Sequence, residues 1–253
     1  MPRRGKIAMG RLFLVCIALL FSFRANAASI IYRADHTQIF IVGKIIAGDF
    51  ERFNEALKAS NGDVIAVNVI SLGGSTEEAI NIGRLIRKLS LGVNVPNLTS
   101  YAPQARAQLC SEAASVAPSP CVCVSACFLV YAGGVARSGN DIHIHRIRFD
   151  DNFYGNLSPG EAEAQYRKAM QIVHDYLAEM EIPNSIFDKM AGMPSYATEQ
   201  LDWRITNNLT WPPSFAEWLF ARCRNPNATN GECLINQQFD AAKRAVKAYI
   251  SQR

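Results

Sequence analysis

The stretch CVSACFLVYAGG, residues 123–134, places Ser125 between two cysteines in an otherwise apolar segment. A buried hydroxyl costs stability unless it is hydrogen-bonded, so this serine either caps a helix or takes part in chemistry. Residues 121–124 fit a strand, and residues 126–132 fit a short apolar helix that ends at a glycine pair. The segment therefore predicts a strand that turns into a helix at Ser125.

The same order of strand, turn and helix occurs upstream. The run VIAVNVIS, residues 64–71, is rich in β-branched residues and predicts a strand in the interior of a sheet. It leads into Gly73 and Gly74, after which Ser75 and Glu78 have the spacing of a capping box at the start of a helix. A further strand over residues 37–45 and a helix over residues 49–62 complete the α/β pattern of this half.

The downstream half contains one strand with two histidines. The segment IHIHRI, residues 142–147, alternates in polarity, so His143 and His145 are expected on one face of a strand. Ser158 and Glu161 form a second capping box, with proline at the first helical position, and open a long helix to about residue 180. Shorter helices are expected over residues 184–190 and 239–250.

The order of SLGGS (71–75), CVSAC (123–127) and IHIHR (142–146) resembles the proteolytic subunit of Clp protease and its periplasmic relatives in the Clp-protease/crotonase superfamily. The resemblance covers roughly residues 39–211. It implies an α/β crotonase-like spiral of ββα units over residues 28–211, with the reactive centre where two units face each other. A C-terminal helical, disulfide-bearing tail over residues 212–253 has no counterpart in the family.

The resemblance also implies site residues: Ser125 is the nucleophile, His145 the general base, and Gly73, Gly74 and Ala126 form the oxyanion hole. The chemistry requires such parts. A serine hydroxyl is a weak nucleophile until a base accepts its proton, and imidazole titrates near neutral pH. Backbone N–H groups in a glycine turn or in the first turn of a helix can bind the oxyanion. These residues predict a serine hydrolase, most simply a peptidase, that needs no cofactor.

The third member of a catalytic triad departs from the family pattern. Alignment of AGMPSYATEQLDW, residues 191–203, places Pro194 or Ser195 where the family has an aspartate. Three groups can orient the imidazole instead: Ser195, a backbone carbonyl, or Asp202. A Ser-His dyad, a weak hydrolase and an inactive enzyme all remain open.

Other interpretations use the same residues. His143 competes with His145 for the role of base. A Ser-Lys hydrolase, similar to signal peptide peptidases, would draw its base from Lys44, Lys168 or Lys189. A non-catalytic module would keep the crotonase-like groove and bind a peptide or partner protein without cutting it. Acyl-CoA chemistry fits less well, since a secreted chain would not meet that substrate.

The first 27 residues have the features of a secretory signal peptide: a basic start, an apolar run and the triplet Ala-Asn-Ala. The apolar run over residues 12–23 is shorter than the roughly 20 residues that cross a bilayer as a helix. We expect cleavage after Ala27 and a periplasmic or secreted protein. A leader retained as a membrane anchor is the less favoured alternative.

Charge excludes one class of partner. The leader contains five basic and no acidic residues, so its removal lowers the formal net charge from +4 to −1. Binding to nucleic acid depends on clustered Lys and Arg, and no nucleic-acid partner is expected. A peptide or unfolded-protein substrate fits best, and a homo-oligomer is compatible with the sequence. No nucleotide-binding motif is present, and nothing in the sequence implies an ATPase partner.

The six cysteines beyond the leader suit an oxidising compartment. Cys223 and Cys233 flank a turn-rich loop, and Cys110 and Cys121 flank another, so disulfides are expected in these two pairs. Cys123 and Cys127 have no assigned partner. Their spacing with Cys121 matches no familiar zinc pattern, and no metal site is expected.

Overall fold

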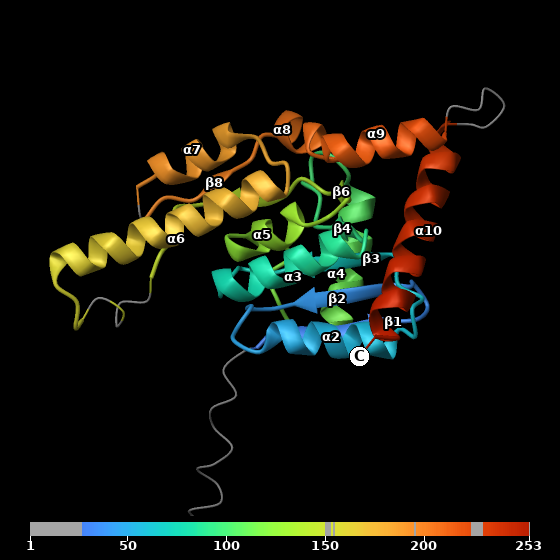
Figure 1. The fold of residues 1–253 in the computed structure, drawn as a ribbon, viewed down its shortest axis with the longest axis horizontal. Helices are drawn as coiled ribbons and strands as arrows, with labels where there is room; N and C mark the ends of the chain where they lie inside the picture. The colour runs from blue at the N-terminus through green and yellow to red at the C-terminus, as the bar shows by residue number, and fades with distance from the viewer. Residues whose placement is uncertain (1–26, 150–152, 154, 195, 224–229, 253) are drawn as a thin grey trace, which may run out of the picture.

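Two β-sheets form the centre of the fold (Figure 1). The computed structural model describes residues 27–149, 153, 155–194, 196–223 and 230–252, and within them the first sheet contains five strands in the order β1-β2-β3-β4-β6. β1 runs antiparallel to β2, and the other pairs are parallel. The strands are Ser29–Arg33 (β1), Gln38–Val42 (β2), Ala66–Ile70 (β3), Gly92–Asn94 (β4) and Ala136–Ser138 (β6).

The second sheet is short and carries the segments singled out by the sequence. It consists of Cys123–Val124 (β5), Ile142–Ile144 (β7) and Glu199–Gln200 (β8). β5 is parallel to β7, and β7 is antiparallel to β8. Ser71, directly after β3, accepts a hydrogen bond from the Val124 N–H at 2.9 Å and donates its own N–H to the Val122 carbonyl at 3.0 Å. The turns that follow β3 and β5 are therefore brought together.

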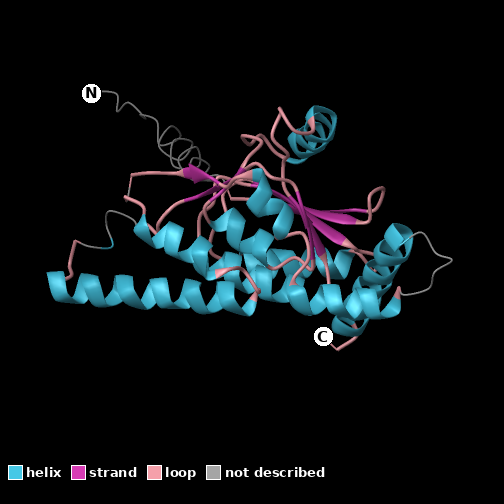
Figure 2. Ribbon diagram, turned by 90° about the horizontal axis from the view of Figure 1, so that it is seen from above, coloured by secondary structure: helices cyan, strands magenta, loops and turns pink. Residues whose placement is uncertain are grey.

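The alternation of side chains along β2 and β3 directs apolar residues to both faces of the first sheet. One face packs on Asp49–Ala59 (α2), Thr76–Lys88 (α3) and Ala126–Ala132 (α5), and this layer forms the main core. Phe40, Val42 and Ile70 point the other way and pack on Pro103–Val116 (α4). Figure 2 shows most of the helices on one side of the strands. α4 was not predicted, because its apolar residues do not gather on one side of the helix.

Helices make up most of the chain after β7. They are Pro159–Glu179 (α6), Asn184–Gly192 (α7), Trp203–Asn208 (α8), Pro213–Arg222 (α9) and Asn230–Ile250 (α10). α10 returns along the α/β body and lies beside α2 (Figure 1). The Gln238 side chain donates to the carbonyls of Ile65 and Ser90, at 3.2 and 3.0 Å. The tail is thus packed against the body.

Both predicted serine caps are present. Ser75 accepts a hydrogen bond from the Glu78 N–H, and Ser158 forms a complete capping box with Glu161. The Glu78 carboxylate departs from the box pattern, because it accepts hydrogen bonds from Gly48 and Phe50 at the start of α2.

Element ends were predicted less well than element types. The strand expected over residues 142–147 ends at Ile144, and the helix expected over residues 49–62 ends at Ala59. α8 and α9 were not expected as helices. The signal peptide prediction falls on residues outside the described range, apart from Ala27.

Three disulfides cross-link the chain. Cys110 is joined to Cys121 and Cys223 to Cys233, the two pairs expected from the loops, and Cys123 is joined to Cys127. Disulfides of this number are typical of proteins outside the cytoplasm. Among the helices in the described ranges, none combines the length and the apolar character needed to cross a membrane.

Candidate active site

Ser125 has a backbone conformation that differs from that of the capping serines. Its φ and ψ are 60° and −121°, and its side chain makes no capping hydrogen bond. Ser75 and Ser158 have φ near −65° and extended ψ, and each accepts a bond from the N–H three residues on. A non-glycine residue in this sparsely populated region costs about 1–3 kcal/mol. Helix capping therefore does not account for Ser125.

The surrounding chain holds Ser125 in this conformation from both sides. Its N–H donates to the His143 carbonyl at 2.9 Å, which ties the turn to β7. Its own carbonyl accepts from the Phe128 N–H at 2.8 Å, which ties the turn to α5. A disulfide between Cys123 and Cys127 spans the same turn.

The glycine turn after β3 lies directly against Ser125. A Cβ atom built on Gly73 would lie 2.6 Å from the Ser125 Cβ, and one on Gly74 would lie 1.9 Å from the Ile45 carbonyl oxygen. Both residues have positive φ, 99° and 137°. The Ser71 hydroxyl accepts the Gly73 N–H at 3.0 Å and holds the turn. Only glycine fits at either position.

Two backbone N–H groups near the serine are candidates for an oxyanion hole. Within the part of the chain that the structure describes, neither the Gly74 N–H nor the Ala126 N–H donates a hydrogen bond, and Ala126 is the first residue of α5. The Gly73 N–H is already bound to Ser71, so Gly73 supplies space and no donor. Gly74, Ala126, Ser125 and His145 line one pocket of about 40 Å³.

His145 follows β7 and is oriented by a backbone group. Its Nδ1 lies 2.6 Å from the Arg146 carbonyl oxygen. A carbonyl can only accept, so we assign the proton to Nδ1, and this leaves the lone pair of Nε2 free to accept a proton. Among the described residues no hydrogen bond joins this imidazole to the Ser125 hydroxyl, but such bonds often form only when substrate is bound.

Ser195 and Asp202 are the two other groups that were candidates to orient the imidazole. Ser195 lies outside the described residues, so its role stays a prediction. Asp202 caps α8, where its carboxylate accepts the Arg204 N–H at 2.7 Å.

His143 belongs to a separate polar network. Its Nε2 lies 2.9 Å from Oδ1 of Asp141, and the same carboxyl group accepts hydrogen bonds from Arg106 and Gln200. Asp141 is buried and joins α4, β7 and β8. Asp141 was not predicted as a site residue, although its place two residues before His143 puts both side chains on one face of the strand.

None of the three lysines considered for a Ser-Lys hydrolase is among the described residues that line the pocket of Ser125 and His145. Lys189 pairs with Glu199 at 2.5 Å, and Lys168 projects from the exposed side of α6. Lys44 lines a different cavity.

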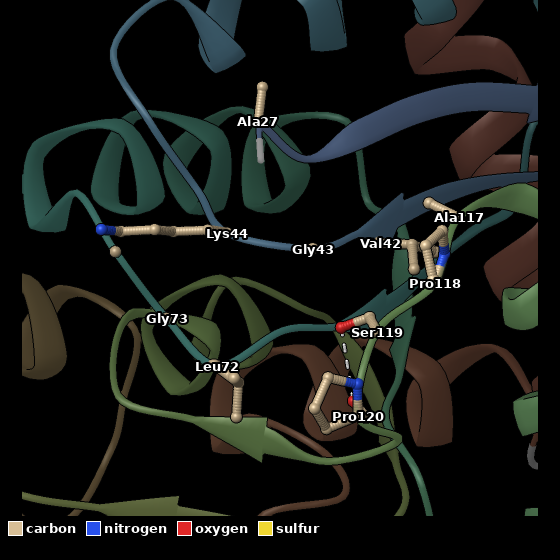
Figure 3. Close-up of a pocket in the computed structure, with 11 residues that line it drawn as sticks. Ala27, Val42, Gly43, Lys44, Leu72, Gly73, Ala117, Pro118, Ser119 and Pro120 are labelled. Carbon is tan, nitrogen blue, oxygen red and sulfur yellow. Dashed lines mark hydrogen bonds between the residues drawn. The ribbon is translucent and has the colours of Figure 1, made fainter. Parts of the chain in front are cut away.

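The cavity lined by Lys44 has a volume of about 570 Å³ and is bordered by the glycine turn (Figure 3). We call it the Lys44 groove. Gly74 lines both cavities, so the groove adjoins the pocket of Ser125. Figure 3 shows Lys44 and Gly73 at one end of the cavity and Pro118, Ser119 and Pro120 at the other. Among the described residues that line it, Lys44 alone carries a charge; the others are Ala27, Val42, Gly43, Leu72, Gly73, Gly74, Ala117, Pro118, Ser119 and Pro120.

Comparison with known proteins gives distant similarity at the level of structure. No protein-family description matches the chain, and no curated protein matches its sequence. Among solved structures, the chain is similar to the 1510-N membrane-bound stomatin-specific protease in a mutant form, with a TM-score of 0.39 and 16% sequence identity. The match covers 64% of this chain and 70% of that one. At this level of similarity, a function has to rest on the geometry of the site.

Proposed function

We propose that the chain is a serine hydrolase of the peptidase type, with a crotonase-like fold, that forms an acyl-enzyme on Ser125 and uses His145 as general base. One observation carries the proposal: Ser125 is held in a strained, uncapped conformation in one pocket with His145 and with Gly74 and Ala126, whose N–H groups have no acceptor among the described residues. A purely structural serine at a helix start would be more stable in the cap geometry. Strain of this kind is characteristic of functional sites.

Acylation follows from these groups. Nε2 of His145 accepts the hydroxyl proton as Oγ of Ser125 attacks the carbonyl carbon of the peptide bond. The N–H groups of Gly74 and Ala126 bind the developing oxyanion, and each such donor typically lowers the barrier by about 3 kcal/mol. The imidazolium then passes the proton to the leaving amine.

Deacylation repeats these reaction steps with water as the nucleophile. His145 accepts a proton from the water as the water attacks the acyl carbon, and the imidazolium gives this proton to Oγ of Ser125 as the tetrahedral intermediate collapses and releases the acid. The Arg146 carbonyl keeps Nδ1 protonated throughout. A carbonyl dipole stabilises the imidazolium less than a carboxylate does, so we expect slower turnover than in an enzyme with an aspartate there.

The Lys44 groove is the proposed place for the substrate chain next to the bond that is cut. Its walls are mostly apolar and its single charge is positive, so apolar or acidic side chains fit it best. A peptide or an unfolded protein in an oxidising, periplasmic or extracellular compartment is the substrate class that we propose.

A non-catalytic binding module is the second candidate. It is favoured by the small volume of the Ser125 pocket, about 40 Å³, and by the carbonyl that stands where a triad would have an acid. Such a module would bind a peptide in the Lys44 groove and leave it intact.

Labelling with a fluorophosphonate distinguishes the two candidates. The hydrolase should be labelled, and mass spectrometry should place the adduct on Ser125. Ser125→Ala should abolish labelling, and His145→Ala should reduce it by about a hundredfold or more. His143→Ala is the matched control, since it removes a neighbouring imidazole bound to Asp141, and it should retain labelling. If the wild-type protein is not labelled but still binds peptide, the hydrolase is excluded and the binding module is the function that remains.

A further inference from the structure

We propose that the disulfide between Cys123 and Cys127 is a positioning device that keeps Ser125 out of the helix-cap conformation and in the reactive one. The proposal rests on the proposed function, because it takes Ser125 to be the nucleophile. It assigns a role to the cysteine pair that the sequence left without a partner.

The disulfide is placed symmetrically about the nucleophile. Cys123 begins β5 two residues before Ser125, and Cys127 lies in the first turn of α5 two residues after it. Their Cα atoms are 5.3 Å apart, and both residues are fully buried. The bond therefore links the strand to the helix across the strained turn.

A competing conformation is available to Ser125. In the caps at Ser75 and Ser158 the hydroxyl accepts the N–H three residues on, which for Ser125 is the N–H of Phe128. In the observed turn that N–H donates to the Ser125 carbonyl instead. Rotation of φ from 60° to about −65° would relieve the strain and form the cap. The hydroxyl would then be engaged with the helix and no longer free to attack.

The disulfide opposes this rotation. A change of φ by more than 100° at Ser125 would reorient the strand end relative to the helix start, whereas a disulfide requires the two Cα atoms to stay within about 4.4–6.8 Å and the Cβ vectors to converge. The two backbone hydrogen bonds of Ser125 break and re-form readily. The covalent bond does not, and it is the restraint that removes the cap state.

Reduction would release the restraint by thiol–disulfide exchange after local opening exposes the buried sulfurs. A thiolate of dithiothreitol attacks one sulfur, the other cysteine leaves as a thiolate, and the second thiol of the reagent closes its own ring. Two electrons and two protons pass to the cysteines, and the reagent becomes the cyclic disulfide. Ser125 is then free to move into the cap.

Disulfide variants test the proposal with matched controls in the same chain. Cys123→Ala/Cys127→Ala should lower the fluorophosphonate inactivation rate constant, kinact, by about a hundredfold while KI is unchanged, because the nucleophile is misplaced but the Lys44 groove is intact. Cys223→Ala/Cys233→Ala removes a disulfide of the tail and should leave kinact unchanged. Melting temperatures of both variants show whether each is folded. Equal losses of kinact in the two variants would overturn the proposal.

Reduction and reoxidation test the same point while Cys123 and Cys127 are kept. The variant Cys110→Ala/Cys121→Ala/Cys223→Ala/Cys233→Ala lacks the other two disulfides and keeps the one between Cys123 and Cys127. Dithiothreitol should abolish labelling, and reoxidation should restore it. Labelling that survives complete reduction, shown by mass analysis of alkylated thiols, would overturn the proposal.

NMR chemical shifts report the conformation of Ser125 independently of any enzymatic activity. The Cα and Cβ chemical shifts of Ser125 should change from positive-φ to helix-cap values in Cys123→Ala/Cys127→Ala and stay unchanged in Cys223→Ala/Cys233→Ala. This shift is expected even if the wild-type protein is not labelled, in which case the proposed function fails and the positioning role stands. Unchanged shifts in the first variant would refute the positioning role whatever the activity.

Discussion

At Ser125 a pair of dihedral angles separates a capping serine from a nucleophile. The residue starts α5 in the position of a cap, yet its φ of 60° keeps the hydroxyl off the helix and in the pocket of His145. The neighbouring Gly73 allows this arrangement, because it leaves room for the Ser125 side chain. Two predictions follow from the chemistry of these single residues.

The first prediction concerns the stability of serine variants. Ser158→Ala removes a complete capping box and should lower the free energy of unfolding by about 1 kcal/mol. Ser125→Ala removes no capping bond, so its free energy of unfolding should stay within about 0.5 kcal/mol of wild type. Urea denaturation measures both. A loss at Ser125 as large as that at Ser158 would indicate a capping role.

The second prediction concerns the space beside the nucleophile. Gly73→Ala should abolish fluorophosphonate labelling, because the new Cβ would meet the Ser125 Cβ at 2.6 Å. Gly48→Ala is the matched control: Gly48 also has positive φ, 89°, but no atom lies within 4 Å of its Cβ position. Both variants strain the backbone, and only the first should stop labelling. Equal labelling of the two proteins would argue against contact between the turn and the nucleophile.

At the scale of elements, one buried guanidinium joins the C-terminal ends of three helices. Arg137, on β6, donates hydrogen bonds to the carbonyls of Ala132, Met180 and Leu209 at 2.7, 2.8 and 3.0 Å, at the ends of α5, α6 and α8. Carbonyls at helix ends lack partners within the helix and carry partial negative charge. Burial, together with the nearby charge of Arg87, lowers the pKa of Arg137 to about 10, and the side chain remains charged at neutral pH.

The third prediction tests this junction. Arg137→Met should lower the free energy of unfolding by about 2–3 kcal/mol, since the Leu209 carbonyl loses its donor, while the carbonyls of Ala132 and Met180 keep hydrogen bonds from Arg87. Arg84→Met is the control, because the pair of Arg84 with Glu179 is on the surface and should contribute no more than about 1 kcal/mol. Thermal and urea denaturation report both. A change of less than about 1 kcal/mol in Arg137→Met would show that water replaces the guanidinium without cost.

At the scale of the whole molecule, Glu181 connects the α6–α7 junction to the C-terminal tail. Its carboxylate accepts hydrogen bonds from the Ser214 N–H and hydroxyl, at 2.9 and 2.6 Å, at the start of α9. Burial raises the pKa of Glu181, but the bonds from Ser214 and the charges of Arg87 and Arg137 outweigh it, so the pKa is lowered overall. A carboxyl group whose pKa is lower in the folded than in the unfolded state stabilises the fold at pH values above its unfolded-state pKa. This stabilisation is lost as the pH falls through the folded-state pKa.

The fourth prediction follows from that sign. The free energy of unfolding of the wild-type protein should fall more steeply than that of Glu181→Gln as pH decreases below about 4.5, the usual range of a glutamate. Above that pH the variant should be the less stable protein. Glu217→Gln, at an exposed position on α9, is the control and should follow the wild-type curve. Identical pH dependence in wild type and Glu181→Gln would show that the carboxylate adds nothing to the attachment of the tail.

Much of the fold could be predicted because its signals are local. The caps at Ser75 and Ser158 depend on groups three residues apart; apolar, β-branched runs identified β2 and β3, and alternating polarity identified β7. α4 escaped prediction because its contacts with the sheet come from residues without a helical pattern. Local spacing also placed the turn at Ser125 and the two loops now closed by disulfides.

By itself the sequence determined the types of the main elements, the order of the two glycine and serine turns, and the residues that compete for the catalytic roles. Tertiary structure decided the conformation of Ser125, the partner of His145 and the assignment of Asp141 to His143. It also decided that Cys123 pairs with Cys127. The last three pair groups within four residues of each other, whereas the conformation of Ser125 depends on Gly73 and the His143 carbonyl, which the ends of β3 and β7 bring to it from distant parts of the chain. A hydroxyl becomes a cap or a nucleophile according to such long-range contacts, which no spacing along the chain encodes.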